Sequence, residues 1–206
     1  RRTHLGERHP TVAQSLKNLA LVLHSQYRYD EAEAAYRQAL GVQTYLLGDT
    51  HPDLGSTLNS LASLLRMRGD YAEAEPLFRR ALDIQSRRGA GNAEYANALT
   101  NLGGLLAETG RLDEARSIQE RSLRLRVGMV GNRHPATATS MFNLALTLRD
   151  LGRLDDADGL LRQALAIYET QLGPRHVFVA LTQTSLGHIA LDRGDLTQAD
   201  AFFDGE

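Results

Sequence analysis

Apolar residues recur at helical spacing along the chain, and short polar or glycine-containing segments interrupt them. The first such stretch spans residues 10–25, and its apolar positions are Val12, Leu16, Leu19, Ala20 and Leu23. A second stretch spans residues 29–46, and its small and large apolar positions are Ala32, Tyr36, Ala39 and Leu40. This i, i+3, i+4 spacing predicts two amphipathic helices, each with one buried stripe. A small residue opposite a large one allows the two helices to pack closely.

The same two-helix pattern recurs five times. The glycine in front of each first helix stands at Gly6, Gly48, Gly89, Gly131 and Gly173, in steps of 42, 41, 42 and 42 residues. A fixed period of this size is typical of stacked-repeat proteins, in which each repeat packs only on its neighbours. We therefore predict a single all-α array of antiparallel helix pairs rather than separate globular domains.

The expected repeats follow from that period. They cover residues 5–46, 47–87, 88–129, 130–171 and 172–206, after the tail of a preceding repeat at residues 1–4. The fifth repeat stops about halfway through its second helix. Because stable arrays carry polar capping repeats at their ends, we expect the chain to be a fragment of a longer protein.

Proline and glycine mark the predicted helix ends. Three prolines follow a histidine at the first turn of a first helix, where their missing N–H costs nothing. They are Pro10, Pro52 and Pro135. The turn inside four of the helix pairs holds a glycine, as expected for a left-handed residue. These are Gly69, Gly110, Gly152 and Gly194. We place Gln26 in that slot of the first pair and expect a strained or looser turn there.

Composition excludes several classes of function. The formal net charge is -2 and Lys17 is the single lysine, so the chain lacks the basic footprint that nucleic-acid binding requires. It has no cysteine, which rules out disulfides and thiolate metal sites. It also lacks a run of about 18 apolar residues that would span a membrane. We expect a cytoplasmic protein without a membrane or nucleic-acid partner.

Two recurrent sets of polar residues have a structural explanation that is simpler than a metal site or an active site. The first set comprises His9, His51, His134 and His176. Equivalent residues of stacked helix pairs lie on the order of 10 Å apart, too far to share one metal ion. The second set comprises carboxylates that open the second helices, where they suit the helix dipole, or form i, i+4 pairs such as Glu33 with Arg37. No phosphate loop or catalytic motif is present, so we expect no enzyme activity, cofactor or metal.

The motifs resemble a known repeat. The Leu-x-x-Leu-Ala-x-x-Leu pattern of the first helix and the Gly-x-(Tyr/Leu)-x-x-Ala pattern after it are similar to the tetratricopeptide repeat. The longer unit, with Leu-Gly-x-x-His-Pro between repeats, resembles the subtype found in kinesin light chains and many bacterial signalling proteins. The resemblance covers essentially the whole chain and implies a right-handed superhelical α-solenoid, whose first helices line a concave groove. It implies that partner peptides lie in that groove and leaves the partner undefined.

A polar ladder follows the predicted inner face of the first helices. Its rungs are Asn18, Ser60, Asn101, Asn143 and Ser185, spaced by 42, 41, 42 and 42 residues. An Asn amide offers a donor and an acceptor, so it pairs with both groups of a peptide unit whatever the side chain. The surrounding groove surface is expected to include Gln14, Lys17, Leu21, His24, Ser56, Asn59, Ser63, Arg66, Asn97, Thr100, Gly104, Thr139, Phe142, Leu146, Arg149 and His188. Alternatively, the same asparagines bond the neighbouring first helix and stabilise the stack.

The predicted groove has two further properties. Lys17, Arg66 and Arg149 make it positive, which favours an acidic or carboxylate-bearing peptide. Gly103 and Gly104 leave a bare floor where a partner backbone can approach closely. The clamp with which some members of this family hold the carboxylate of a chaperone tail is incomplete, because Lys17 alone fits it.

The third repeat departs from the others. Asn92 and Ala93 replace the His-Pro pair, and Gln119 and Ser122 stand where other repeats have a large apolar residue and an alanine. Loss of a buried apolar contact weakens a core by about 2 to 5 kcal/mol in the worst case. We predict that this repeat is the least stable joint of the array.

The leading hypothesis is a non-catalytic protein-interaction module that binds an extended or short helical peptide segment, within a larger signalling or regulatory protein. A structural alternative is self-association, or packing on another domain of the same chain, through the apolar end with Leu196, Phe202 and Phe203. RNA binding is a third class, supported only by the arginines of residues 116–126, which are better explained as a solvated helix face.

Overall fold

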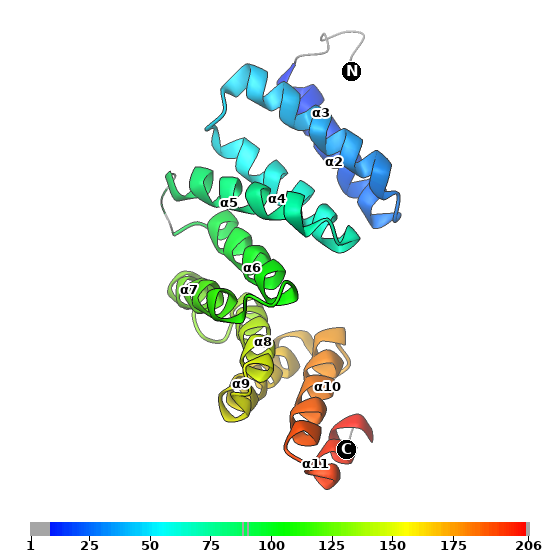
Figure 1. The fold of residues 1–206 in the computed structure, drawn as a ribbon, viewed down its shortest axis with the longest axis vertical. Coiled ribbons are helices and arrows are strands. Elements are labelled where there is room, and N and C mark those ends of the chain that lie inside the picture. The colour runs from blue at the N-terminus through cyan, green and yellow to red at the C-terminus, as the bar shows by residue number, and fades with distance from the viewer. Residues whose placement is uncertain (1–8, 88, 90, 205–206) are drawn as a thin grey trace. The chain divides into compact units, whose positions relative to one another are not determined.

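The computed structural model describes residues 9–87, 89 and 91–204 of the 206-residue chain. Within these residues it contains ten α-helices and no strand (Figure 1). The helices are α2 Pro10–Ser25, α3 Tyr29–Leu47, α4 Pro52–Arg68, α5 Tyr71–Arg87, α6 Ala93–Glu108, α7 Leu112–Val130, α8 Pro135–Asp150, α9 Leu154–Leu172, α10 Val177–Asp192 and α11 Leu196–Asp204. The predicted all-α fold of consecutive helix pairs is confirmed.

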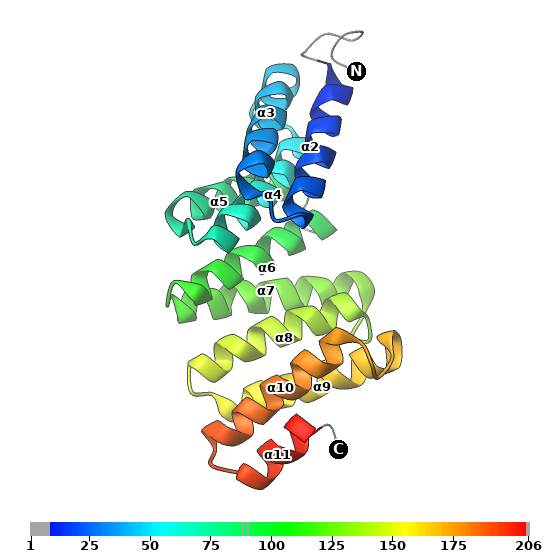
Figure 2. The same cartoon turned by 90° about the vertical axis from the view of Figure 1, so that its right-hand side faces the viewer.

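The helices pack in pairs along the chain (Figure 2). Helix α2 packs on α3, α4 on α5, α8 on α9 and α10 on α11. The chain divides into two compact units, residues 1–105 and residues 106–206. The first unit holds α2 to α5 and most of α6, and the second holds α7 to α11. The repeat boundaries stay a prediction, and the expected tail at residues 1–4 lies outside the described residues.

Histidine starts four of the first helices. In α2, α4, α8 and α10 the imidazole Nδ1 accepts a hydrogen bond from the backbone N–H two residues later. The N···N distances are 3.3, 3.3, 3.0 and 3.2 Å in chain order. Three of these helices continue with the predicted proline in their first turn. The histidines are therefore helix N-caps, which confirms their structural interpretation.

The turn inside each helix pair uses a left-handed residue. Gly69, Gly110, Gly152 and Gly194 have φ angles of 85°, 77°, 75° and 79°. In the first pair the left-handed residue is Tyr27, with a φ of 62°, whereas Gln26 has a φ of -91°. The slot predicted at Gln26 was therefore wrong by one residue. A step of 42 residues back from Gly69 leads to Tyr27, which is therefore the equivalent position.

Small and large apolar side chains fill the space between the paired helices. Buried examples in the first unit are Ala32, Tyr36, Ala39, Ala74, Phe78 and Ala81. Leu19 contradicts the predicted stripe, because its side chain is 49% exposed while the equivalent Leu61 and Leu144 are buried. Among the described residues no helix precedes α2, so none covers Leu19.

The third repeat differs in two ways. Asn92 replaces the histidine cap, because its Oδ1 accepts a hydrogen bond from the Tyr95 N–H at 2.7 Å. Gln119 and Ser122 are buried in α7, with 3% and 1% of their surfaces exposed. Gln119 Oε1 has no hydrogen-bond partner among the described residues. A buried unpaired oxygen destabilises a fold, but Gln43 Oε1 and Gln85 Oε1 in the first two repeats also have no partner among the described residues. The weakness of the third repeat therefore stays a prediction.

Candidate functional site

The predicted groove residues of the first unit lie along three first helices, α2, α4 and α6. We call eight of their polar side chains the polar row: Gln14, Lys17, Asn18, Ser56, Asn59, Ser63, Arg66 and Asn101. Lys17 connects α2 to α4, because its Nζ donates a hydrogen bond to Ser56 Oγ at 2.7 Å. Burial lowers the pKa of the Lys17 ammonium, and the charges of Asp53 and Glu94 act against that shift. The polar row is therefore continuous from α2 to α4.

Asn101 connects α4 to α6. Its Nδ2 donates to Asn59 Oδ1 at 3.1 Å and lies 3.3 Å from Ser63 Oγ. These bonds run to the neighbouring first helix, as the structural interpretation of the ladder predicted. These bonds use the Nδ2 donor, so the Asn101 amide stabilises the stack of α4 and α6. Its side chain nevertheless remains partly exposed.

Arg66 closes the floor that the glycines were expected to leave open. Its guanidinium donates to the carbonyl oxygen of Asn101 at 3.3 Å. It also lies directly over Gly104, so close that a Cβ at that position would clash with it. The bare floor predicted at Gly104 is therefore wrong, because a long side chain from α4 fills the space. A partner reaches this backbone only when Arg66 moves.

The predicted groove residues of the first unit differ in solvent exposure. The exposed ones are Gln14, Asn18, Leu21 and Asn97. The Ser60 and Thr100 hydroxyls donate to backbone carbonyls of their own helices, which makes them weaker candidates for contact with a partner. His24 is half-buried, and its Nε2 lies 3.2 Å from Met67 Sδ. The accessible amides of this surface are thus concentrated on α2 and α6.

The predicted residues of the second unit lie on α8 and α10. The Tyr168 hydroxyl donates to Thr139 Oγ1 at 3.0 Å. Arg149 forms ion pairs with Asp150 and Asp192, each at 3.5 Å, so the positive charge expected there is compensated. Of the others, Phe142, Asn143 and Leu146 are half-buried, Ser185 is buried and His188 is exposed. This face offers apolar carbon and one asparagine amide rather than a polar row.

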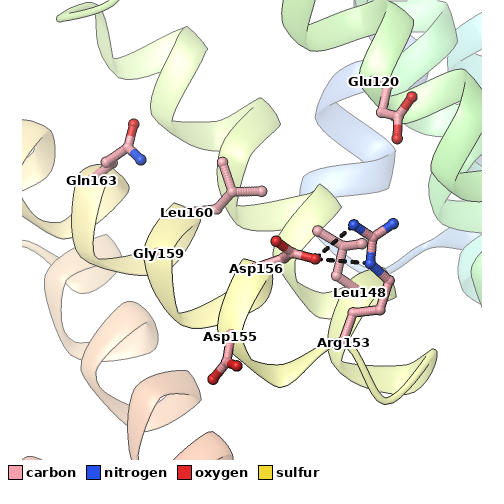
Figure 3. Close-up of a pocket in the computed structure, with 8 residues that line it drawn as sticks. All are labelled: Glu120, Leu148, Arg153, Asp155, Asp156, Gly159, Leu160 and Gln163. Atoms are coloured by element: carbon pink, nitrogen blue, oxygen red, sulfur yellow. Dashed lines mark hydrogen bonds and ion pairs between the residues drawn. The ribbon is translucent and has the colours of Figure 1, made fainter.

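A hollow in the second unit was not predicted from the sequence. It has a volume of about 390 Å³ and is lined by Glu120, Leu148, Arg153, Asp155, Asp156, Gly159, Leu160 and Gln163 (Figure 3). Arg153 pairs with Asp156 at 2.6 Å, and Asp155 pairs with Arg193 at 2.6 Å. Glu120 pairs more loosely with Arg116 at 3.9 Å and Arg124 at 3.8 Å, so all three carboxylates have arginine partners. No sequence motif marks the hollow, because its lining comes from α7, from the end of α8 and from α9.

The recurrent charged groups on the second helices form ion pairs. The predicted i, i+4 ion pairs form on the second helices, between Glu33 and Arg37 at 2.8 Å and between Glu75 and Arg79 at 2.7 Å. In the described part of the chain, no three His, Asp or Glu side chains are grouped to hold a metal ion. None of the helices described combines the length and apolar composition needed to cross a membrane.

Several solved structures share this fold. A putative kinesin light chain of Podosopora anserina with nearly identical TPR-like repeats has a TM-score of 0.80 at 22% identity, over 95% of this chain and 93% of that chain. BtubC (BKLC) from P. vanneervenii has a TM-score of 0.82 at 22% identity, over 95% and 78%. A Rap protein complexed with Competence and Sporulation Factor has a TM-score of 0.77 at 17% identity, over 92% and 51%. Comparison with curated proteins gave no match.

Family models give the assignment directly. A tetratricopeptide repeat model matches residues 11–87, 94–170 and 148–204, and a second tetratricopeptide repeat model matches residues 59–128. These matches cover most of the chain, and the kinesin light chain neighbours agree with the resemblance found in the repeat unit. Such repeats generally mediate protein–protein interaction and are typically non-catalytic. The chain belongs to the tetratricopeptide repeat family.

Proposed function

We propose that the chain is a non-catalytic module that binds an extended or short helical segment of another protein on the face formed by its first helices. The observation that carries this proposal is the polar row of the first unit, which runs over three helices and keeps Gln14, Asn18 and Asn97 exposed beside it or within it. Exposed polar side chains that do not contribute to the stability of the fold are typical of a binding surface. We further propose that the module serves a larger signalling or regulatory protein.

The chemistry of the row suits recognition of a peptide backbone. Asn18 Oδ1 already accepts a hydrogen bond from Gln14 Nε2 at 2.9 Å. The exposed amide keeps its two donor hydrogens and a second lone pair, so it can still pair with a peptide unit whatever its side chain. Asn101 would contribute through its remaining acceptor capacity, because its Nδ2 already bonds α4. The Rap protein with a similar fold was solved in complex with Competence and Sporulation Factor, which supports the class of ligand for such a scaffold.

An acidic segment fits the first unit better than the second. Lys17 and Arg66 bring two positive charges to the polar row, where Asp53 and Glu94 act on Lys17. In the second unit Arg149 is paired with Asp192. The charge-assisted bonds that a carboxylate forms with such cations are about twice as strong as neutral hydrogen bonds. We therefore place the acidic part of the partner segment against α2 and α4.

The single lysine makes a direct test. Reductive ¹³C-methylation labels Lys17 and the α-amino group alone, so one side-chain signal reports on the polar row. N-acetylated decapeptides with three aspartates are titrated against the chain, with three-asparagine decapeptides as the charge control. The proposal expects the Lys17 signal to shift with the acidic peptides and the shift to be reduced several-fold in the variant Asn18→Ala/Asn97→Ala.

A matched variant separates binding from folding. Gln163→Ala/Thr170→Ala removes two exposed polar groups from α9, and it should leave the titration unchanged. Equal binding by Asn18→Ala/Asn97→Ala and the wild type would contradict the proposal. A Lys17 signal that does not shift with any of the peptides would contradict it as well.

Self-association through the end of the chain is the second candidate. Leu196 and Phe203 are 66% and 45% exposed, whereas Phe202 packs against the apolar core around Leu161 and Leu186. Two exposed large apolar side chains on one short helix favour contact with another apolar surface. Sedimentation velocity over a hundredfold range of concentration tests this candidate. A size that stays constant, or that stays concentration-dependent in Leu196→Ser/Phe203→Ser, removes it.

A further inference from the structure

Tyr27 occupies a position that the fold reserves for glycine. The four equivalent residues in the later repeats are glycines, all with positive φ, and Tyr27 is the single non-glycine residue with positive φ among the described residues. The left-handed conformation is unfavourable for an L-residue, and for a bulky side chain it is a true outlier. The chain thus keeps a tyrosine where its own repeats show that glycine is the better fit.

Packing within the fold does not compensate for this strain. The Tyr27 side chain is 78% exposed, and its ring meets Tyr29 edge to face at 6.2 Å. Met67 at the end of α4 is 57% exposed, and Tyr29 is half-buried against the ring of His24 at 5.8 Å. We call Tyr27, Tyr29 and Met67 the aromatic edge. It lies at the turn ends of α2, α3 and α4, where Met67 Sδ is 3.2 Å from His24 Nε2.

The charges around the aromatic edge are predominantly negative. Their ion pairs join Arg28 with Glu31, Arg68 with Asp30, Glu33 and Asp70, and Arg37 with Glu33 and Glu73. These five carboxylates outnumber the three arginines by two. Asp30 in particular has a side chain that is 93% exposed beside the start of α3, so the surface has carboxylate capacity left for a cation.

We propose that the aromatic edge docks an arginine-bearing segment of a partner protein. A guanidinium stacks on the face of a tyrosine and at the same time donates to a carboxylate, which a lysine ammonium does less well. Tyr27 is 78% exposed, so its ring is accessible to a guanidinium. Backbone strain at this residue is retained because the ring is used in binding. This surface is separate from the polar row and does not depend on it.

The variant Tyr27→Gly tests the proposal through two effects of opposite sign. The probe is a fluorescein-labelled Gly-Ser decapeptide with three arginines, and its control carries three citrullines, which are neutral and nearly isosteric. We expect the wild type to bind the arginine peptide more tightly, and Tyr27→Gly to lose about fivefold of that affinity. The same variant should raise the Tm by roughly 2 °C, because glycine relieves the strained turn.

Control variants complete the test. Tyr27→Phe keeps the ring and should keep both the affinity and the Tm, and Asn18→Ala should leave the arginine peptide unaffected even if binding of acidic peptides is lost. Equal affinity for the arginine and citrulline peptides overturns the proposal. So does an unchanged preference in Tyr27→Gly, or a lower Tm in that variant. A wild-type dimer that Tyr27→Gly abolishes also overturns it, since the occupant is then a second copy of the chain.

Discussion

The two units present first-helix faces of different chemistry on the same kind of scaffold. One position along these helices holds Gln14, Ser56 and Asn97 in the first unit, and Thr139 and Leu181 in the second. A second position holds Lys17, Asn59 and Thr100 in the first unit, and Phe142 and Thr184 in the second. The buried positions change far less, since Ala32, Ala74, Ala115 and Ala157 are all fully buried. Repeat proteins of this kind keep a common core and vary the face that meets a partner.

Arginine links between neighbouring repeats show what the units share. Arg68 in the first unit reaches back to Asp30 and Glu33 on α3. Arg193 in the second unit reaches back to Asp155 and Asp158 on α9 in the same way. In both units the arginine pairs with one exposed carboxylate, Asp30 or Asp155, and with one largely buried carboxylate, Glu33 or Asp158. The recurrence of these ion pairs indicates that repeats stack with the same geometry in both units. The units therefore differ mainly in their first-helix faces, which are polar in the first unit and more apolar in the second.

The largest effect is expected when the buried glutamine of the second unit is introduced at the equivalent position of the first. Phe78 is fully buried and corresponds to Gln119 one repeat later. We expect Phe78→Gln to lower the free energy of unfolding by about 3 kcal/mol, because it removes a large apolar side chain and buries an amide. Urea denaturation followed by circular dichroism measures this. A loss below about 1 kcal/mol would mean that this position tolerates polarity everywhere.

The reciprocal change should make the second unit more like the first. Gln119→Leu removes the buried oxygen that has no partner among the described residues, and Leu161 occupies the equivalent position one repeat on. We expect a gain of about 1.5 kcal/mol in the free energy of unfolding. Hydrogen exchange should show increased protection in α7 in particular. If α7 is already the best protected helix in the wild type, the predicted weak joint does not exist.

Matched cap variants test whether the scaffold is equal in both units. His51 caps α4 and His134 caps α8. Replacement of either by alanine should cost about 1 kcal/mol, and replacement by aspartate should restore the cap. Thermal unfolding of the four variants provides the comparison. A difference of more than about 1 kcal/mol between the two alanine variants would contradict a common scaffold.

The smallest effect concerns the titration of the polar face in the first unit. Burial lowers the pKa of Lys17 below its ordinary value of 10.5, so the unfolded chain holds this proton to higher pH than the folded chain. The contribution of Lys17 to stability therefore rises as the pH increases through the folded pKa and levels off above the unfolded value. The ¹³C-methyl shift of the labelled lysine measures both values. Glu94→Gln should lower the folded value further, because it removes a charge that favours the ammonium.

The period and most helix bounds could be predicted because proline marks the start of three first helices and glycine marks four of the five turns. Helix α2 runs from Pro10 to Ser25 as expected, and α3 extends only to Leu47. The left-handed residue of the first turn was misplaced because Tyr27 lacks the glycine signal that marks the other turns. Arg66 over Gly104 could not be predicted, since the conformation of a long side chain depends on the neighbouring helix. Whether the ladder residues contact a partner stays a prediction.

The histidine caps have a consequence for the chemical state of the imidazoles. Because Nδ1 accepts a hydrogen bond from the backbone, it carries no proton in the capped state, and the proton of the neutral ring resides on Nε2. When the start of one helix opens, its imidazole loses the hydrogen bond that fixes the tautomer. The other three imidazoles keep their hydrogen bonds and their tautomers. Each of α2, α4, α8 and α10 therefore contains its own spectroscopic reporter of local opening, and α6, which starts after Asn92, is the one first helix without such a probe among those described.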